Sequence, residues 1–134
     1  AYVYYDDLLT ASLLAHEMVH AEQFISEFAL GQTGQSCVGR EAEAYGRQID
    51  LLINLNQGEK NSISSRINLG QVNNQLFSLK QLNDDVLGSA MNSCGVPDNA
   101  VLSQSDTNCL SKNINHILTT IISDNPYYQQ QCNL

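Results

Sequence analysis

Apolar residues recur at every third or fourth position along most of this chain, and that helical periodicity is the feature that most constrains its fold. Strand-favouring residues gather in one stretch only, AYVYY at residues 1–5. We therefore expect a mainly α fold, a small helical bundle with at most a minimal N-terminal strand. A chain of 134 residues without an internal repeat or a linker has room for one core, so residues 1–134 are expected to form a single domain.

Four helical regions are expected from this periodicity and from the Gly and Pro residues that interrupt it. The first starts at a cap, which is Asp6, Asp7 or Thr10, and ends at about Leu30. The second runs from about Gly39 to Leu55. The third passes through Val72 and Leu76 to Ala90 and could be broken at Gly70, and the fourth runs from about Thr107 to Ser123. Pro126 is expected to end the last helix. The tail after it is expected to be loose unless Cys132 is tethered.

The first helix carries an apolar stripe that is expected to pack on the core, because its members follow the i, i+4, i+7 spacing. The stripe consists of Leu14, Met18, Ala21, Ile25 and Phe28. His16 and His20 lie well over 90° around the helix from it, on a face shared with Leu13 and Phe24. We therefore expect this helix to have two buried sides, one of which lines a cleft.

Fourteen acidic and six basic residues give the chain a formal charge of −8. Such a surface repels phosphate backbones, so we expect no nucleic-acid partner. The longest apolar run is far shorter than the roughly 18 residues that a membrane span needs, so no span is expected either. Residue 1 is Ala and not Met, which is consistent with a fragment of a longer precursor from which a leader or a preceding domain was removed.

The four cysteines form an even set without a CxxC pair, which predicts two disulfides and a secreted or extracytoplasmic protein. Three pairings are possible. We favour Cys94 with Cys109, which would close the loop around the CGVP turn, and Cys37 with Cys132, which would pin the tail. The alternative is four reduced, buried cysteines in a cytosolic protein.

The stretch HEMVHAEQ, residues 16–23, has the spacing of a helical zinc site. Four residues advance an α-helix by about 400°, so His16 and His20 point the same way to within about 40° and lie one turn apart. Neutral imidazoles in that arrangement can chelate Zn2+. Glu17 would then lie beside the metal, where it can take a proton from bound water as a general base.

A catalytic zinc site needs a third protein ligand, and REAEAYGRQ, residues 40–48, offers two carboxylates. Glu41 and Glu43 are separated by about 200° of rotation, so both cannot face the metal. Glu41 shares the expected inward face with Tyr45, and we assign it as the third ligand. Glu43 is then a solvated residue that pairs with Arg47, or a partner behind the ligands. The reverse assignment of the two glutamates, and His116 as the ligand, are the alternatives.

HEMVH followed by EAEAY resembles the zincin metallopeptidases of the glutamate-ligand branch. More narrowly, it is similar to the short HExxH…ExEAY metallopeptidase domains of bacterial secreted and polymorphic-toxin proteins. The resemblance covers about residues 8–55 and implies a small zincin-like helical bundle. It also implies a site made of His16, His20 and Glu41 on zinc with Glu17 as the general base.

The predicted activity is zinc-dependent hydrolysis of peptide (amide) bonds, with Glu17 activating a zinc-bound water and a peptide or protein as substrate. Tyr45 stands where related families have an Asp that orients a histidine. We expect Tyr45 either to lie in the core or to act as a catalytic residue that hydrogen-bonds to a metal ligand or to an oxyanion. His116 is the other candidate donor to the oxyanion. The alternative function is a non-catalytic metal-binding or interaction domain of a larger secreted protein.

Overall fold

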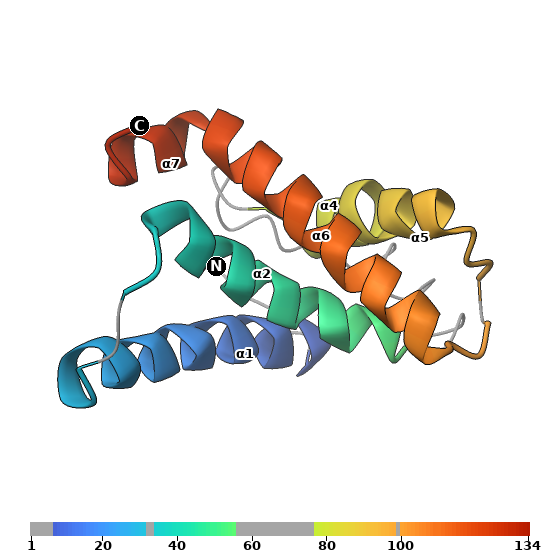
Figure 1. Cartoon of the computed structure of the whole chain (residues 1–134), viewed down its shortest axis with the longest axis horizontal. Helices are drawn as coiled ribbons and strands as arrows, with labels where there is room; N and C mark the ends of the chain where they lie inside the picture. Colours follow the sequence, from blue (N-terminus) through green and yellow to red (C-terminus); the bar gives the residue numbers. More distant parts are fainter. Residues whose placement is uncertain (1–6, 32–33, 56–76, 99) are drawn as a thin grey trace, which may run out of the picture.

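The computed structural model describes residues 7–31, 34–55, 77–98 and 100–134. Within these ranges the chain forms a small, mainly α fold without a strand, as expected (Figure 1). The strand expected at residues 1–5 lies outside the described residues. So do the cap expected at Asp6 and the segment around Gly70, Val72 and Leu76.

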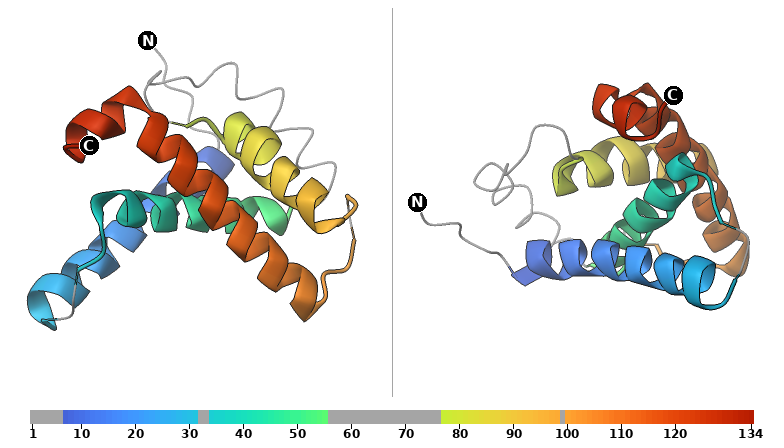
Figure 2. Two further views of the ribbon diagram at one scale, coloured as in Figure 1. Left: turned by 45° about the horizontal axis from the view of Figure 1, so that its top comes forward. Right: turned by 90° about the vertical axis from the view of Figure 1, so that its left-hand side faces the viewer.

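The first two helices form an antiparallel pair. Helix α1 spans Asp7–Phe24 and continues directly as the π-helical segment η1, Ile25–Ala29, so the helical structure ends where it was expected to end. The chain then turns back into α2, Cys37–Ile53, which runs in roughly the opposite direction and packs across α1 at an angle (Figure 1, Figure 2). Ser36 starts α2, because its hydroxyl accepts a hydrogen bond from the backbone N–H of Gly39 at 3.0 Å.

The remaining elements are α4 (Leu79–Gln81), the π-helical segment η3 (Leu82–Leu87), α5 (Gly88–Cys94), α6 (Gln104–Asp124) and α7 (Pro126–Gln131). The first three follow one another without interruption and end at Gly95, whose φ of 65° lies in the left-handed region that glycine favours. Pro126 ends α6 as expected, but it also begins α7, where its missing N–H breaks no helical bond. The tail is therefore helical.

The hydrophobic core lies where α2, η3 and α6 meet (Figure 2). Ile49 and Leu52 enter it from α2, Leu118 and Ile122 from α6, and Leu82 from η3, and none of these side chains is more than 1% exposed. Burying a side chain of this size is worth about 1.5–3 kcal/mol. Helix α2 is thereby held between α6 on one side and α1 on the other.

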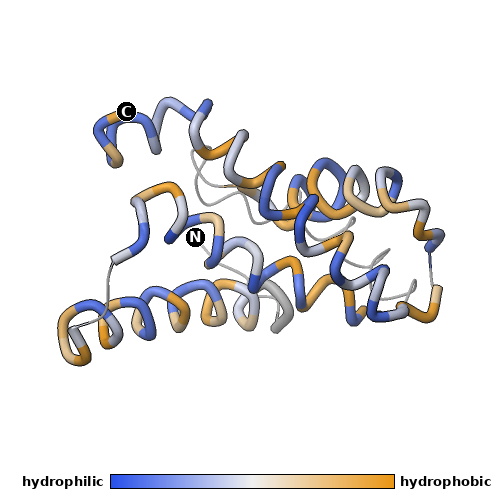
Figure 3. Tube along the Cα trace, in the orientation of Figure 1, coloured by the Kyte–Doolittle hydropathy of each residue, from blue (hydrophilic) through white to orange (hydrophobic). Residues whose placement is uncertain are grey.

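Helix α1 packs on α2 through a mainly polar face, in which Ser12, His16, Val19 and Gln23 are buried. The apolar stripe expected to reach the core is instead exposed, as are Leu13 and Phe24, so the expectation of two buried sides is wrong. The hydrophobic residues of α1 are visible in Figure 3, where the helix lies along the lower edge of the molecule. The polar face can be buried because its side chains are hydrogen-bonded, which removes the usual cost of burying polar groups.

Two disulfides tie the helices together. Cys37–Cys132 joins the start of α2 to the end of α7, and Cys94–Cys109 joins the end of α5 to α6. Both pairings are those favoured from the sequence, and they are typical of proteins that fold in an oxidising compartment. In the part of the chain that the structure describes, no helix is both long and apolar enough to cross a membrane.

Candidate metal centre

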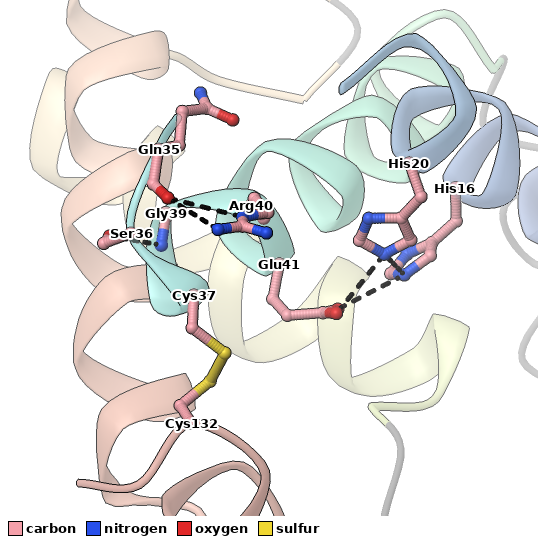
Figure 4. The surroundings of a disulfide bond; sticks show 9 residues. All are labelled: His16, His20, Gln35, Ser36, Cys37, Gly39, Arg40, Glu41 and Cys132. Carbon is pink, nitrogen blue, oxygen red and sulfur yellow. Dashed lines mark hydrogen bonds and ion pairs between the residues drawn. A yellow bond between two sulfur atoms is a disulfide. The ribbon is translucent and has the colours of Figure 1, made fainter. Parts of the chain in front are cut away.

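Two imidazoles from α1 and one carboxylate from α2 converge between the two helices (Figure 4). The Nε2 atoms of His16 and His20 are 3.2 Å apart. The Glu41 carboxylate faces both of them, with Oε2 at 3.4 Å from His16 Nε2 and Oε1 at 3.3 Å from His20 Nε2. The residues expected on one face of α1 and on the inward face of α2 are therefore brought together.

A chain of hydrogen bonds places an N–H of His20 on Nδ1. The Gln23 side-chain N–H donates to the backbone carbonyl of Arg40 at 3.2 Å, and a carbonyl can only accept. The Gln23 Oε1 must then be the atom that faces His20 Nδ1, at 2.9 Å, where it accepts the ring N–H. A neutral imidazole that donates from Nδ1 has its lone pair on Nε2, so the neutral form of His20 presents that lone pair to Glu41.

His16 is held in the same way from the opposite helix. Its Nδ1 lies 2.9 Å from Oε1 of Gln48, whose amide nitrogen faces the hydroxyl of Ser12 at 3.4 Å. With Nδ1 donating to Gln48, the His16 lone pair also lies on Nε2. In their neutral forms both imidazoles thus direct a lone pair at one point, and an outer partner that orients each ring is the arrangement usual for metal-binding histidines.

The donor set fits a cation. Two lone pairs and a carboxylate that face one another repel unless a positive charge lies among them, and Glu41 is buried, with 9% of its surface exposed. The three ligand atoms lie within 4.8 Å of one another. In the described part of the chain, His16, His20 and Glu41 form the group of side chains that could hold a metal ion. Two imidazole nitrogens with one carboxylate oxygen is a set that zinc accepts.

The three candidate ligands differ in their exposure. The side chains of His16 and Glu41 are each 11% exposed, whereas the His20 side chain is 28% exposed. The His20 edge of the group is therefore the more accessible one. Glu17, whose side chain is exposed, is 60° around the helix from His20 on this same side.

The alternative ligands lie elsewhere. Glu43 is exposed, and its carboxylate accepts a hydrogen bond from the side chain of Gln35 at 2.6 Å. The ion pair expected between Glu43 and Arg47 is not among the ion pairs of the described residues. His116 is exposed on α6 and does not join the group of ligand atoms.

Tyr45 lies directly behind the ligands. Its ring packs edge-on against His16, with centroids 4.6 Å apart, while its hydroxyl is hydrogen-bonded to that of Tyr128. Burial raises the pKa of Tyr45 to about 12, and burial likewise raises the pKa of Tyr128, so both phenols are neutral near pH 7. This is the core position that was one of the two expectations for Tyr45. A part in stabilising an oxyanion stays a prediction.

Sequence reasoning missed Gln23 and Tyr128. Gln23 could have been found, because it is three residues after His20 and therefore on the same helical face. Tyr128 carries no such signal, since 83 residues separate it from Tyr45.

Comparison with known proteins found no matching family model, no matching curated protein and no matching solved structure. The resemblance to zincins therefore rests on HEMVH and EAEAY and on the convergence of their side chains.

Proposed function

We propose that this protein is a zinc-dependent hydrolase of peptide bonds. The observation that carries the proposal is the convergence of the Nε2 atoms of His16 and His20 on the Glu41 carboxylate, with the exposed Glu17 next to His16 on the same helix. Three protein ligands leave one of the four positions of zinc for water or substrate, which is the arrangement of catalytic zinc sites, whereas structural sites are closed by four protein ligands.

Zinc bound at this centre would supply a Lewis acid that polarises the substrate carbonyl and lowers the pKa of water. The protein's own residues do the rest. Gln23 and Gln48 hold the two histidines in the orientation in which Nε2 faces the centre. Glu17 accepts a proton as the water oxygen attacks the carbonyl carbon, and it passes that proton to the amide nitrogen as the C–N bond breaks.

The test uses Glu17→Gln, which keeps the size of the side chain and removes its basicity. We expect the purified variant to retain about one zinc per chain by elemental analysis. Hydrolysis of a peptide mixture, followed by mass spectrometry, should fall by about 10²–10⁴-fold, the contribution typical of a general base. Asp85→Asn, which removes an exposed carboxylate on η3, is the matched control and should change neither measurement.

Absence of zinc from the purified wild-type protein would refute the proposal. Unchanged hydrolysis in Glu17→Gln would refute the role of Glu17. Zinc in the wild-type protein together with no cleavage of any peptide in the mixture would favour the non-catalytic metal-binding domain instead.

A further inference from the structure

The outward side of α1 and η1 is covered with large apolar side chains. Its members are Leu14 (59% exposed), Met18 (54%), Phe24 (62%), Ile25 (52%) and Phe28 (71%), and they are called here the outer face of α1. The rings of Phe24 and Phe28 lie against each other, with centroids 4.8 Å apart. Soluble proteins seldom leave a contiguous apolar surface of this kind uncovered unless something binds to it.

Helical geometry explains why no described element covers this face. At 100° per residue, Leu14, Met18 and Ile25 lie within about 40° of one another. His16 and Gln23, which face α2, lie about 160–180° around the helix from Leu14. Helix α2 is the described element against which α1 mainly packs (Figure 2). The outer face therefore lies on the side of α1 opposite to α2.

The charges beside this face are of one sign. Glu17 and Glu22 are exposed on its two sides, about 60° and 80° around the helix from Leu14, and α1 contains no Lys or Arg. A second copy of the chain would bring the same carboxylates together, and an anionic lipid surface would be repelled. Lysine or arginine in a partner would instead meet opposite charge.

We propose that the outer face of α1 binds a basic, amphipathic polypeptide segment of a partner protein. Large apolar side chains of that segment would cover Leu14, Met18 and Ile25. Leu14 and Met18 are about one helical turn apart, and Met18 and Ile25 are about two turns apart, which matches the spacing along one face of an amphipathic partner. Its Lys or Arg side chains would lie over Glu17 and Glu22. This inference concerns a surface outside the ligand set, but it shares Glu17 with the proposed hydrolase, because a bound partner would pair with the carboxylate that is proposed to act as the general base.

The probe is a fluorescently labelled helical peptide of Leu and Lys, with all leucines on one face, and the measurement is fluorescence anisotropy with the full chain. We expect binding that weakens as salt is raised. Replacing Leu14, Met18 and Ile25 together by Ala should weaken it at least tenfold. Val101→Ala is the matched control, because Val101 is apolar and 96% exposed but lies outside α1, and it should leave the affinity unchanged.

Three outcomes would overturn the proposal. The first is equal binding of a scrambled Leu/Lys peptide or of a Leu/Glu peptide. The second is self-association of the wild-type chain that the triple replacement abolishes, which would make a second copy the occupant. The third is stronger retention on phosphatidylglycerol vesicles than on the peptide, which would assign the face to a membrane. The triple replacement is checked by circular dichroism, and its side chains are exposed, so folding is expected to persist.

Discussion

At the scale of single residues, Glu41 and Glu43 show how two neighbouring carboxylates acquire different chemistry. Glu41 is buried against two imidazoles, whereas Glu43 is in solvent beside Gln35. Removing a carboxylate from water costs several kcal/mol unless a cation or good hydrogen bonds replace the solvent. A bound cation would therefore offset the cost of burying the Glu41 carboxylate, whereas the Glu43 carboxylate is in solvent and has no such cost.

We predict that Glu41→Gln and Glu43→Gln differ strongly in zinc affinity. Glu41→Gln removes a direct ligand. It should therefore weaken zinc binding by more than roughly 10–100-fold, which is the loss typical when a residue that hydrogen-bonds to a ligand is removed. Glu43→Gln should leave the affinity within about a factor of two, because the residue is exposed and outside the ligand group. Competition with a chromogenic chelator measures both constants. Similar losses in the two variants would refute the ligand assignment.

The candidate site could be predicted from the sequence where it depends only on the angles between side chains around the axis of one helix. The i, i+4 spacing places His16 beside His20, and the 200° between Glu41 and Glu43 separates their roles. Neither argument depends on tertiary structure. The contact of Tyr45 with Tyr128 is set by how α7 docks, and nothing local in the sequence specifies that docking.

At the scale of elements, α6 begins three residues before the expected Thr107, and its cap explains the difference. Ser103 accepts a hydrogen bond from the backbone N–H of Asp106, and the Asp106 carboxylate accepts one from the backbone N–H of Ser103, each at 3.1 Å. This reciprocal pair satisfies two N–H groups that a helix start leaves free. The signal was present in the sequence as a Ser followed three residues later by an Asp.

We predict that Ser103→Ala lowers the free energy of unfolding by about 1 kcal/mol, the usual cost of losing a capping hydroxyl. Ser111→Ala, at an exposed position inside the same helix, is the control and should be neutral or slightly stabilising, because Ala is the better helix former. Urea denaturation followed by circular dichroism gives both values. An equal change in the two variants would show that the cap contributes nothing.

Element existence was predicted better than element packing. Periodicity located α2 and α6, because those helices bury apolar residues such as Ile49 and Leu118. The same reasoning chose the wrong face of α1. Hydrogen bonds to α2 make a polar face of α1 the buried one, and such pairing between helices is invisible to a count of apolar positions.

At the scale of the whole molecule, the candidate metal centre is connected to the C-terminus. Cys37, one turn before Glu41 on α2, is bonded to Cys132 just after α7 (Figure 4). Helix α7 in turn carries Tyr128, whose hydroxyl bonds to Tyr45 behind His16. The C-terminal segment thus supports both helices that supply the candidate ligands. The disulfide in this link was expected from the sequence, whereas the contact between Tyr45 and Tyr128 was not.

We predict that the two disulfides differ in their effect on stability and on the metal centre. Cys37–Cys132 spans 95 residues and Cys94–Cys109 spans 15. Because the entropy removed from the unfolded chain grows with loop length, replacing the first pair by serine should cost about 4.7 kcal/mol, and replacing the second should cost about 3 kcal/mol. Denaturant titration of the two double variants measures this difference.

The two disulfides are also expected to differ in their effect on zinc affinity. The Cys37→Ser/Cys132→Ser variant should bind zinc at least several-fold more weakly, because α7 then no longer holds Tyr128 against Tyr45 and the start of α2 loses its anchor one turn from Glu41. The Cys94→Ser/Cys109→Ser variant, whose link joins α5 to α6, should retain the wild-type affinity in the fraction that stays folded. Equal zinc affinity in both variants would mean that α1 and α2 position His16, His20 and Glu41 without help from the C-terminal helix.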